Sequence, residues 1–138
     1  MNVALDTNVL VDLWANTAQG RTNAATLHAL QAGGHGLSIS GVVYAELHGI
    51  PGISKVALDT ALAGMGVTID ALTPLAVWDE AGRVHAAISQ RRRKAKVVQA
   101  RRPLADHLIG AHALVRADAL LTSNPGDFTD FAALRIIR

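Results

Sequence analysis

The strongest constraint on the fold is an alternation of short apolar runs with longer amphipathic segments along the chain. Apolar runs bounded by turn residues predict buried strands, and apolar residues at helical spacing predict helices between them. We predict strands near residues 2–6, 36–39, 67–70 and 118–122, and a short last strand at 134–137. The predicted helices cover residues 8–15, 21–32, 41–49, 53–63, 75–96 and 104–116. This order predicts an α/β fold, with a mainly parallel central sheet covered by helices on both faces.

Length and composition limit the class of protein further. The 138 residues, half of them apolar, are enough for one domain with a real core, and no repeat or low-complexity linker divides them. No apolar run is long enough to span a membrane, and the first residues lack a signal-peptide pattern, so we expect a cytoplasmic protein with no membrane partner. Because the chain has no cysteine, any metal ion must be bound by oxygen or imidazole ligands.

Positive charge is concentrated in one short segment. Seven of the 13 basic residues occur between residues 91 and 102, where there is no acidic residue: Arg91, Arg92, Arg93, Lys94, Lys96, Arg101 and Arg102. The rest of the chain has six basic and 11 acidic residues, a net charge of −5. Such a division favours a polyanionic ligand, with a solvated helix face as the alternative interpretation.

Two acidic residues follow the first two predicted strands. In an open parallel sheet, ligands bind beyond the carboxyl ends of the strands, and Asp6 lies at the end of the first strand. After the second strand, Ser40 is suited to cap a helix whose second turn carries Glu46. Apolar neighbours surround Glu46, so we expect this acid on the core-facing side of its helix, where it needs a functional explanation.

Two further acidic residues are placed near the same edge. Pro103 suits the first turn of a helix, and Asp106 lies in that turn. Asp127 follows a turn in the segment SNPGDF, directly after the fourth predicted strand, and could point back toward Asp6. Asp118 opens that strand and should lie about 20 Å from the carboxyl edge, at about 3.3 Å per residue, so we leave it out of the site.

Clustered carboxylates repel one another unless a cation holds them. The four acids Asp6, Glu46, Asp106 and Asp127 therefore predict a site for Mg²⁺, with Mn²⁺ as a substitute. Two such ions, or one, could activate water for attack on a phosphodiester without a covalent enzyme intermediate. The alternative interpretation is that each acid separately caps a helix or stabilises a turn.

Hydroxyl and amide side chains accompany these acids. We interpret Thr7 and Asn8 as caps of the following helix, or as hydrogen-bond partners of an acid in the site. Thr122 could contact a phosphate or stabilise the turn in which it lies, and Asn124 offers a further polar ligand near Asp127.

Four segments together resemble the PIN domain family, in particular its VapC-type ribonuclease toxins. They are LDTNVLVDL at residues 5–13, SISGVVYAEL at 38–47, PLADHLIGAHAL at 103–114 and LLTSNPGDF at 120–128. The resemblance implies one PIN-like domain over residues 1–138, a three-layer α/β/α sandwich. It also implies that Asp6, Glu46 and Asp106 bind metal, with Asp127 or Asn124 supplying the fourth ligand.

The same resemblance implies a Mg²⁺- or Mn²⁺-dependent endoribonuclease, usually a homodimer, inhibited by a small VapB-type antitoxin that inserts a segment into the groove. The basic segment from Arg91 to Arg102 would then attract the RNA backbone without reading its bases. Two alternatives remain. One is a haloacid-dehalogenase-like phosphatase, although this class needs an Asp where the chain has Asn8. The other is a non-catalytic module that binds RNA or protein.

Overall fold

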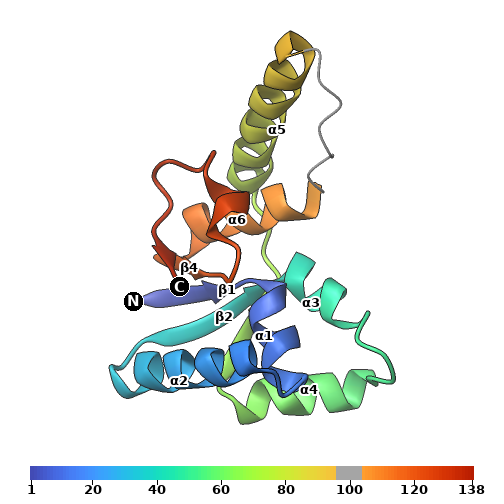
Figure 1. Ribbon diagram of the computed structural model, residues 1–138, viewed down its shortest axis with the longest axis vertical. Coiled ribbons are helices and arrows are strands. Elements are labelled where there is room, and N and C mark those ends of the chain that lie inside the picture. Colours follow the sequence, from blue (N-terminus) through green and yellow to red (C-terminus); the bar gives the residue numbers. More distant parts are fainter. Residues whose placement is uncertain (96–103) are drawn as a thin grey trace.

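The computed structural model describes residues 1–95 and 104–138, and its centre is a five-stranded parallel sheet (Figure 1). The strand order is β3-β2-β1-β4-β5, and every neighbouring pair is parallel. The strands are β1 (Asn2–Leu5), β2 (Gly36–Ser40), β3 (Val67–Asp70), β4 (Ala119–Leu121) and β5 (Ile136–Ile137). Parallel pairing brings all the carboxyl ends of the strands to one edge of the sheet.

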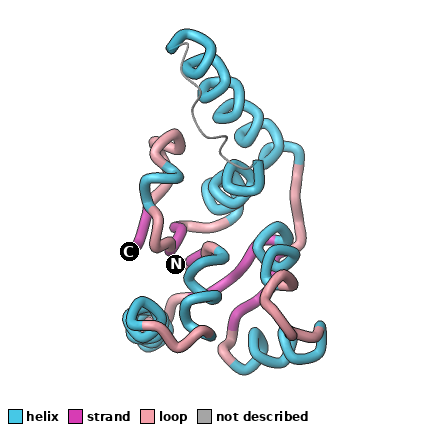
Figure 2. The backbone as a smooth tube through the Cα atoms, turned by 45° about the vertical axis from the view of Figure 1, so that its right-hand side comes forward, coloured by secondary structure: helices cyan, strands magenta, loops and turns pink. Residues whose placement is uncertain are grey.

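Helices cover both faces of this sheet. They are α1 (Thr7–Trp14), α2 (Ala18–Ala32), α3 (Gly41–Leu47), α4 (Lys55–Gly64), α5 (Leu75–Ala95) and α6 (Leu104–Arg116). In Figure 1, α1, α2 and α4 lie below the sheet, and α5 and α6 lie above it. The long helix α5 extends away from the sheet in both views (Figures 1 and 2). The predicted three-layer α/β/α architecture is confirmed.

Burial follows the position of each strand in the sheet. The central strands β1, β2 and β4 are almost wholly buried, as expected for parallel strands covered on both faces. The edge strands β3 and β5 are partly exposed. Side chains of the central strands, such as Val3, Ile39 and Leu120, are completely inaccessible and belong to one hydrophobic core. The strands and the helices that cover them therefore share this core.

Side-chain caps fix where the helices begin. Thr17, Ser40 and Ser54 accept backbone hydrogen bonds at the starts of α2, α3 and α4, which confirms the predicted cap at Ser40. The interpretation of Thr7 and Asn8 as caps of α1 is wrong, because Asp6 itself accepts the hydrogen bond from the Thr7 N–H. Such caps each contribute about 1 kcal/mol.

The boundaries agree with the predicted ones within a few residues, and the largest difference is at α2. This helix begins at Ala18 rather than near residue 21, because Thr17 caps it. Its Gly20 packs against the carbonyl oxygen of Asp12, which would lie 2.1 Å from an added Cβ. Pro103, which we expected in the first turn of α6, lies outside the described residues. Among the helices of residues 1–95 and 104–138, none is long and apolar enough to cross a membrane.

Candidate active site

A cleft of about 280 Å³ opens at the carboxyl edge of the sheet. Asp6 reaches it from the end of β1, Glu46 from α3, Asp106 from the first turn of α6, and Asp127 from the 3-10 helix η1 (Pro125–Phe128). The full lining is Asp6, Thr7, Asn8, Val11, Glu46, Asp106, Asn124 and Asp127. The fold thus brings together the four acids selected from the sequence, although 121 positions separate the first from the last.

Asp6 is the most buried of these acids, with 6% of its surface exposed. The Thr7 N–H donates to Oδ1 at 2.8 Å, and the Thr122 hydroxyl donates to Oδ2 at 2.8 Å. The Asp6 N–H in turn donates to the Leu121 carbonyl at 2.9 Å. Both carboxylate oxygens and the backbone are therefore held, so the orientation of Asp6 in the cleft is fixed.

The surroundings of Asp6 disfavour its negative charge. Burial is the largest cause, and together with repulsion from Glu46 and Asp127 it raises the pKa of Asp6 above its ordinary value. The hydrogen bonds from Thr122 and the Thr7 N–H act in the opposite direction but do not cancel this increase in pKa. A cation bound in the cleft would remove the repulsion and favour the ionised carboxylate.

Glu46 does not face the core, contrary to our expectation from the sequence. The residues of α3 that are buried in the core are Val43 and Leu47, whereas Glu46 is exposed and lines the cleft. A helical residue next to Leu47 is rotated by about 100° from it, which places the carboxylate beside the core rather than within it. The Thr7 hydroxyl donates to Glu46 Oε1 at 2.7 Å and so connects this acid to the start of α1.

Thr122 and Asn8 connect the ends of β1 and β4. Thr122 is 1% exposed, and its hydroxyl accepts from the Asn124 N–H at 3.0 Å while donating to Asp6. The Asn8 side-chain oxygen accepts from the Ser123 N–H at 3.4 Å. Thr122 is too buried to contact a phosphate, so its hydroxyl positions Asp6 and the turn instead. Val11 also lines the cleft and was not selected from the sequence, because an apolar side chain in an amphipathic helix gives no signal of a functional site.

The donor set suits a hard divalent cation. Four carboxylates line the cleft and offer oxygen ligands, which are the ligands that Mg²⁺ and Mn²⁺ prefer. Within residues 1–95 and 104–138, no three Asp, Glu or His side chains converge closely enough to form a complete metal-binding group. The cleft therefore fits a divalent cation by the chemistry of its donors, and the side chains must move together to coordinate one.

The basic segment is only partly described. Arg92, Arg93 and Lys94 lie in the last turn of α5, on the part of the helix that extends from the body (Figure 1). The guanidinium of Arg91, one position before them, donates to Asp130 Oδ1 at 2.6 Å. Lys96, Arg101 and Arg102 lie outside the described residues. The RNA-backbone role of this segment stays a prediction.

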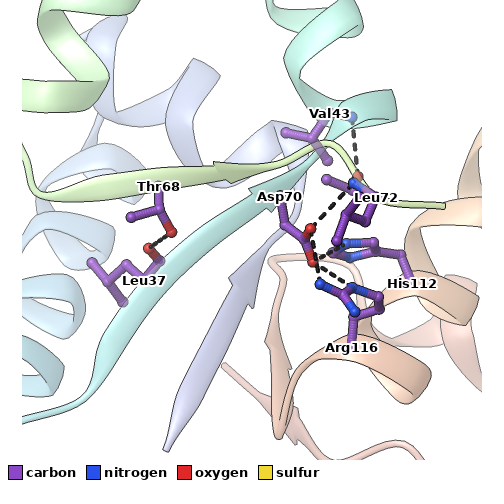
Figure 3. A network of polar contacts seen from close by, with 8 residues as sticks. Leu37, Val43, Thr68, Asp70, Leu72, His112 and Arg116 are labelled. Atoms are coloured by element: carbon purple, nitrogen blue, oxygen red, sulfur yellow. Dashed lines mark hydrogen bonds and ion pairs between the residues drawn. The ribbon is translucent and has the colours of Figure 1, made fainter. Parts of the chain in front are cut away.

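A second strand-end aspartate, Asp70, was not selected from the sequence. It ends β3, yet it faces α6 instead of the cleft (Figure 3). Arg116 Nε donates to Asp70 Oδ2 at 2.8 Å, and His112 Nε2 lies 3.1 Å from the same oxygen. Arg116 is the main cause of a lowered Asp70 pKa. The sequence signal was an acid at the end of the third predicted strand, but its partners are more than 40 positions away.

Asp118 lies where the sequence analysis placed it. It precedes β4, and its carboxylate accepts from the Asn2 N–H at 2.6 Å, at the start of β1. Both residues are at the amino ends of their strands, at the edge of the sheet opposite the cleft. The exclusion of Asp118 from the site therefore agrees with the structure.

Two apolar hollows continue from the acidic cleft along α1 and the α3–α4 connection. The first, of about 400 Å³, shares Val11 and Glu46 with the cleft. The second, of about 360 Å³, shares Trp14, Ile50 and Pro51 with the first. We refer to the two hollows together as the apolar channel. It connects a strongly acidic end with a surface suited to apolar side chains.

One comparison with known proteins identifies a family. Residues 3–134 match the family described as PIN domain. No curated protein sequence matches the chain significantly.

Solved structures with the same fold include toxin–antitoxin complexes. VapBC2 from Rickettsia felis, bound to a DNA fragment from its promoter, is 21% identical, with a TM-score of 0.66 over 99% of this chain and 98% of the other. VapBC-1 from nontypeable Haemophilus influenzae is 21% identical, with a TM-score of 0.66 over 99% and 97%. A toxin–antitoxin complex from Klebsiella pneumoniae is 21% identical, with a TM-score of 0.59 over 99% and 96%. At these identities the similarity establishes a shared fold.

Proposed function

Because the chain belongs to the PIN domain family, we propose that it is a metal-dependent endoribonuclease and the toxin of a toxin–antitoxin pair. The observation that carries this proposal is the acidic cleft, in which Asp6, Glu46, Asp106 and Asp127 meet at the carboxyl edge of the sheet. Structural neighbours described as VapBC and as a toxin–antitoxin complex support the toxin assignment.

The four acids are the proposed catalytic residues and ligands of Mg²⁺, or of Mn²⁺ in its place. Such a cation supplies Lewis-acid activation of water and neutralises charge on the scissile phosphate. Asp6 would be the most precisely placed ligand, because Thr7 and Thr122 fix both of its oxygens. Glu46 would be oriented by the Thr7 hydroxyl at 2.7 Å. Asn124 lines the same cleft and stays the alternative to Asp127 as the fourth ligand.

An RNA substrate is supported by the charge distribution. Arg92, Arg93 and Lys94 follow one another at the end of α5, and such cations attract phosphates without reading bases. Binding should therefore depend steeply on salt. The sequence of this chain contains no recognisable motif that would indicate which RNA bases it selects.

An antitoxin partner is supported by the apolar channel. A segment of a small VapB-type protein could place apolar side chains along Trp14, Ile50 and Pro51 and an Arg or Lys among the acids at the Glu46 end. Expression of the chain alone should then be toxic, and co-expression of such a partner should relieve the toxicity. A soluble, metal-loaded chain that is harmless to cells would contradict the toxin assignment without contradicting nuclease chemistry.

A homodimer is part of the same proposal. Four apolar side chains, from β3 through the following connection to the start of α5, are between 41% and 72% exposed: Ile69, Leu72, Leu75 and Trp78. An exposed group of this kind favours an interface with another protein surface. Measurement of the molar mass in solution tests this part of the proposal.

The two alternatives are less well supported. A haloacid-dehalogenase-like phosphatase needs a second acid at position 8, where Asn8 instead accepts from the Ser123 backbone. The PIN family match over residues 3–134 also favours a nuclease. A non-catalytic module would leave the raised pKa of Asp6 and its acidic neighbours without a use.

One assay separates the three functions. The purified chain is incubated with RNA and with a small phosphomonoester, each with Mg²⁺, with Mn²⁺ or with a chelator. We expect cleavage of RNA with either metal and none with the chelator, together with no hydrolysis of the phosphomonoester. Hydrolysis of the phosphomonoester alone would support the phosphatase, and RNA binding without cleavage would support the non-catalytic module.

A further inference from the structure

The turn that carries Asp127 is held between two helices, α5 and α6. This segment runs from Asn124 through η1 to Phe131 and is called here the Asp127 turn. Phe128 and Phe131 anchor it in the core, with 2% and 3% of their surfaces exposed. Because Asp127 lies between the strand β4 and these anchors, its position in the cleft depends on how the turn is fixed.

On the α6 side, the turn packs directly against the helix that carries Asp106. The Phe131 ring lies so close to Gly110 that an added Cβ would be 2.5 Å from the ring atom Cε2. Gly110 is four residues after Asp106, so both lie on the same side of α6, one turn apart. This contact sets how closely the Asp127 turn approaches the helix of Asp106.

On the α5 side, two arginines hold the residue that precedes Phe131. Arg91 Nη1 donates to Asp130 Oδ1 at 2.6 Å, and Arg83 Nη2 donates to the Asp130 carbonyl at 3.4 Å. The Asp130 side chain is 14% exposed, whereas that of Arg91 is 62% exposed. An ion pair this exposed adds little stability, but it can still select one position of a short turn. The pair therefore contributes geometry more than stability.

Arg91 and Arg93 lie in the same basic segment but differ in their contacts. Both are exposed arginines in the last turns of α5, and either could attract RNA phosphates. Arg91 is bound to Asp130, and this ion pair raises the pKa of its guanidinium. The Arg93 side chain makes no hydrogen bond or ion pair with residues 1–95 or 104–138, so it provides a matched control for Arg91.

We propose that Arg91 is a positioning residue of the acidic site, which acts through Asp130 to hold the Asp127 turn against α6. This proposal rests on the proposed function for its catalytic meaning, because it assumes that Asp127 helps to bind the metal. It separates Arg91 from the RNA-binding cations with which the sequence analysis grouped it. In this proposal Arg93 binds RNA phosphates, and Arg91 fixes the position of the Asp127 turn.

The test compares Arg91→Gln, Asp130→Asn and Arg93→Gln with the wild-type chain. Titration calorimetry measures the affinity for Mn²⁺ alone, and hydrogen exchange measures the protection of amides 126–131 without metal. We expect Arg91→Gln and Asp130→Asn each to weaken Mn²⁺ binding by about 10-fold, as is usual when the support of a ligand is lost. Both should also accelerate exchange in the turn, and Arg91→Lys should restore part of both properties.

The matched control and the double variant complete the design. Arg93→Gln should leave Mn²⁺ affinity and exchange of the turn unchanged while weakening RNA binding. Arg91→Gln combined with Asp130→Asn should weaken Mn²⁺ binding by less than the product of the two single effects, because both substitutions remove the Arg91–Asp130 pair. Wild-type exchange and wild-type Mn²⁺ affinity in Arg91→Gln would overturn the proposal. A wild-type chain that binds no Mn²⁺ would overturn the proposed metal site, and the exchange data alone would then decide whether Arg91 holds the turn.

Discussion

Two aspartates end parallel strands at the same edge of the sheet, yet their surroundings are opposite. Asp6, after β1, is buried beside Glu46 and Asp127, and its pKa is raised. Asp70, at the end of β3, is bound by Arg116 and His112 from α6, and its pKa is lowered (Figure 3). The protein itself compensates the charge of Asp70, whereas the charge of Asp6 is placed among like charges.

The difference shows how a structural acid can be distinguished from a functional one. A carboxylate matched by an arginine contributes to the folded state and needs nothing further. A buried carboxylate beside two other acids is unfavourable for the fold, and such perturbed groups concentrate at functional sites. Position at the carboxyl edge therefore does not distinguish the two aspartates, whereas the charge of their neighbours does, and it favours the proposed metal-binding role for Asp6.

The largest expected effect concerns cleavage. Asp6→Asn should reduce metal-dependent RNA cleavage by more than about 100-fold, since losing even the support of a metal ligand costs about 10- to 100-fold. Asp70→Asn should leave the cleavage rate unchanged, because its partners are outside the cleft. Initial rates at saturating Mg²⁺ measure both variants. Equal losses in the two variants would abolish the distinction between the two aspartates.

The next effect concerns stability, and it is expected at Asp70 rather than at Asp6. Asp70→Asn should lower the free energy of unfolding by about 2 kcal/mol, because hydrogen bonds to charged partners are lost. Asp79→Asn, at an exposed position of α5, is the control and should change it by less than about 0.5 kcal/mol. Urea unfolding in the absence of metal measures these values. A stable Asp70→Asn variant would show that the ion pair at β3 does not support the fold.

A smaller effect concerns pH, and its sign differs between the two residues. Where a pKa is raised, as for Asp6, the folded state retains its proton longer, so stability is lost as pH rises from about 4 through the raised pKa. Where it is lowered, as for Asp70, stability is present above about pH 4 and lost as pH falls through the lowered pKa.

Urea unfolding of the metal-free protein between pH 3 and 7 tests these signs. Relative to wild type, Asp6→Asn should become more stable as pH rises above about 4. As pH rises toward about 4, Asp70→Asn should lose stability relative to wild type, because only the wild type gains the stability of the ionised Asp70 carboxylate. Parallel curves for the wild type and both variants would contradict the assigned pKa directions.

The sequence predicted which acids lie at the carboxyl edge of the sheet better than it predicted how their side chains are oriented and paired. Alternating strands and helices predicted the architecture, and the rule for parallel sheets then placed Asp6, Asp106 and Asp127 at one edge. That inference needed only the order of elements and the position of each acid within its element. It succeeded because parallel pairing converts a position along the chain into a position in space.

The orientation of individual side chains and their hydrogen-bond and ion-pair partners could not be predicted in the same way. The seven-residue helix α3 left the rotation of Glu46 undetermined, and packing of Val43 and Leu47 decided it. Threonine is a common helix-capping residue, but Asp6 rather than Thr7 occupies the cap position of α1. The Thr7 hydroxyl is therefore available to donate to Glu46. The ion pair of Arg91 with Asp130 joins residues 39 positions apart, and only tertiary structure brings them together.

The central claim is that the carboxylates of the cleft repel one another and form a cation site, and Asp106→Asn tests it most directly. The measurement is thermal unfolding of wild type and variant at pH 6 and 8, with and without 10 mM Mg²⁺, beside RNA cleavage. If the dissociation constant is about 1 mM, Mg²⁺ should stabilise the wild type by about 1.4 kcal/mol. Without metal, Asp106→Asn should be as stable as the wild type or more so, and it should lose both the Mg²⁺ response and RNA cleavage. A variant that keeps full metal-dependent cleavage and the Mg²⁺ response would contradict the account, because Asp106 would then be only a favourable charge at the start of α6.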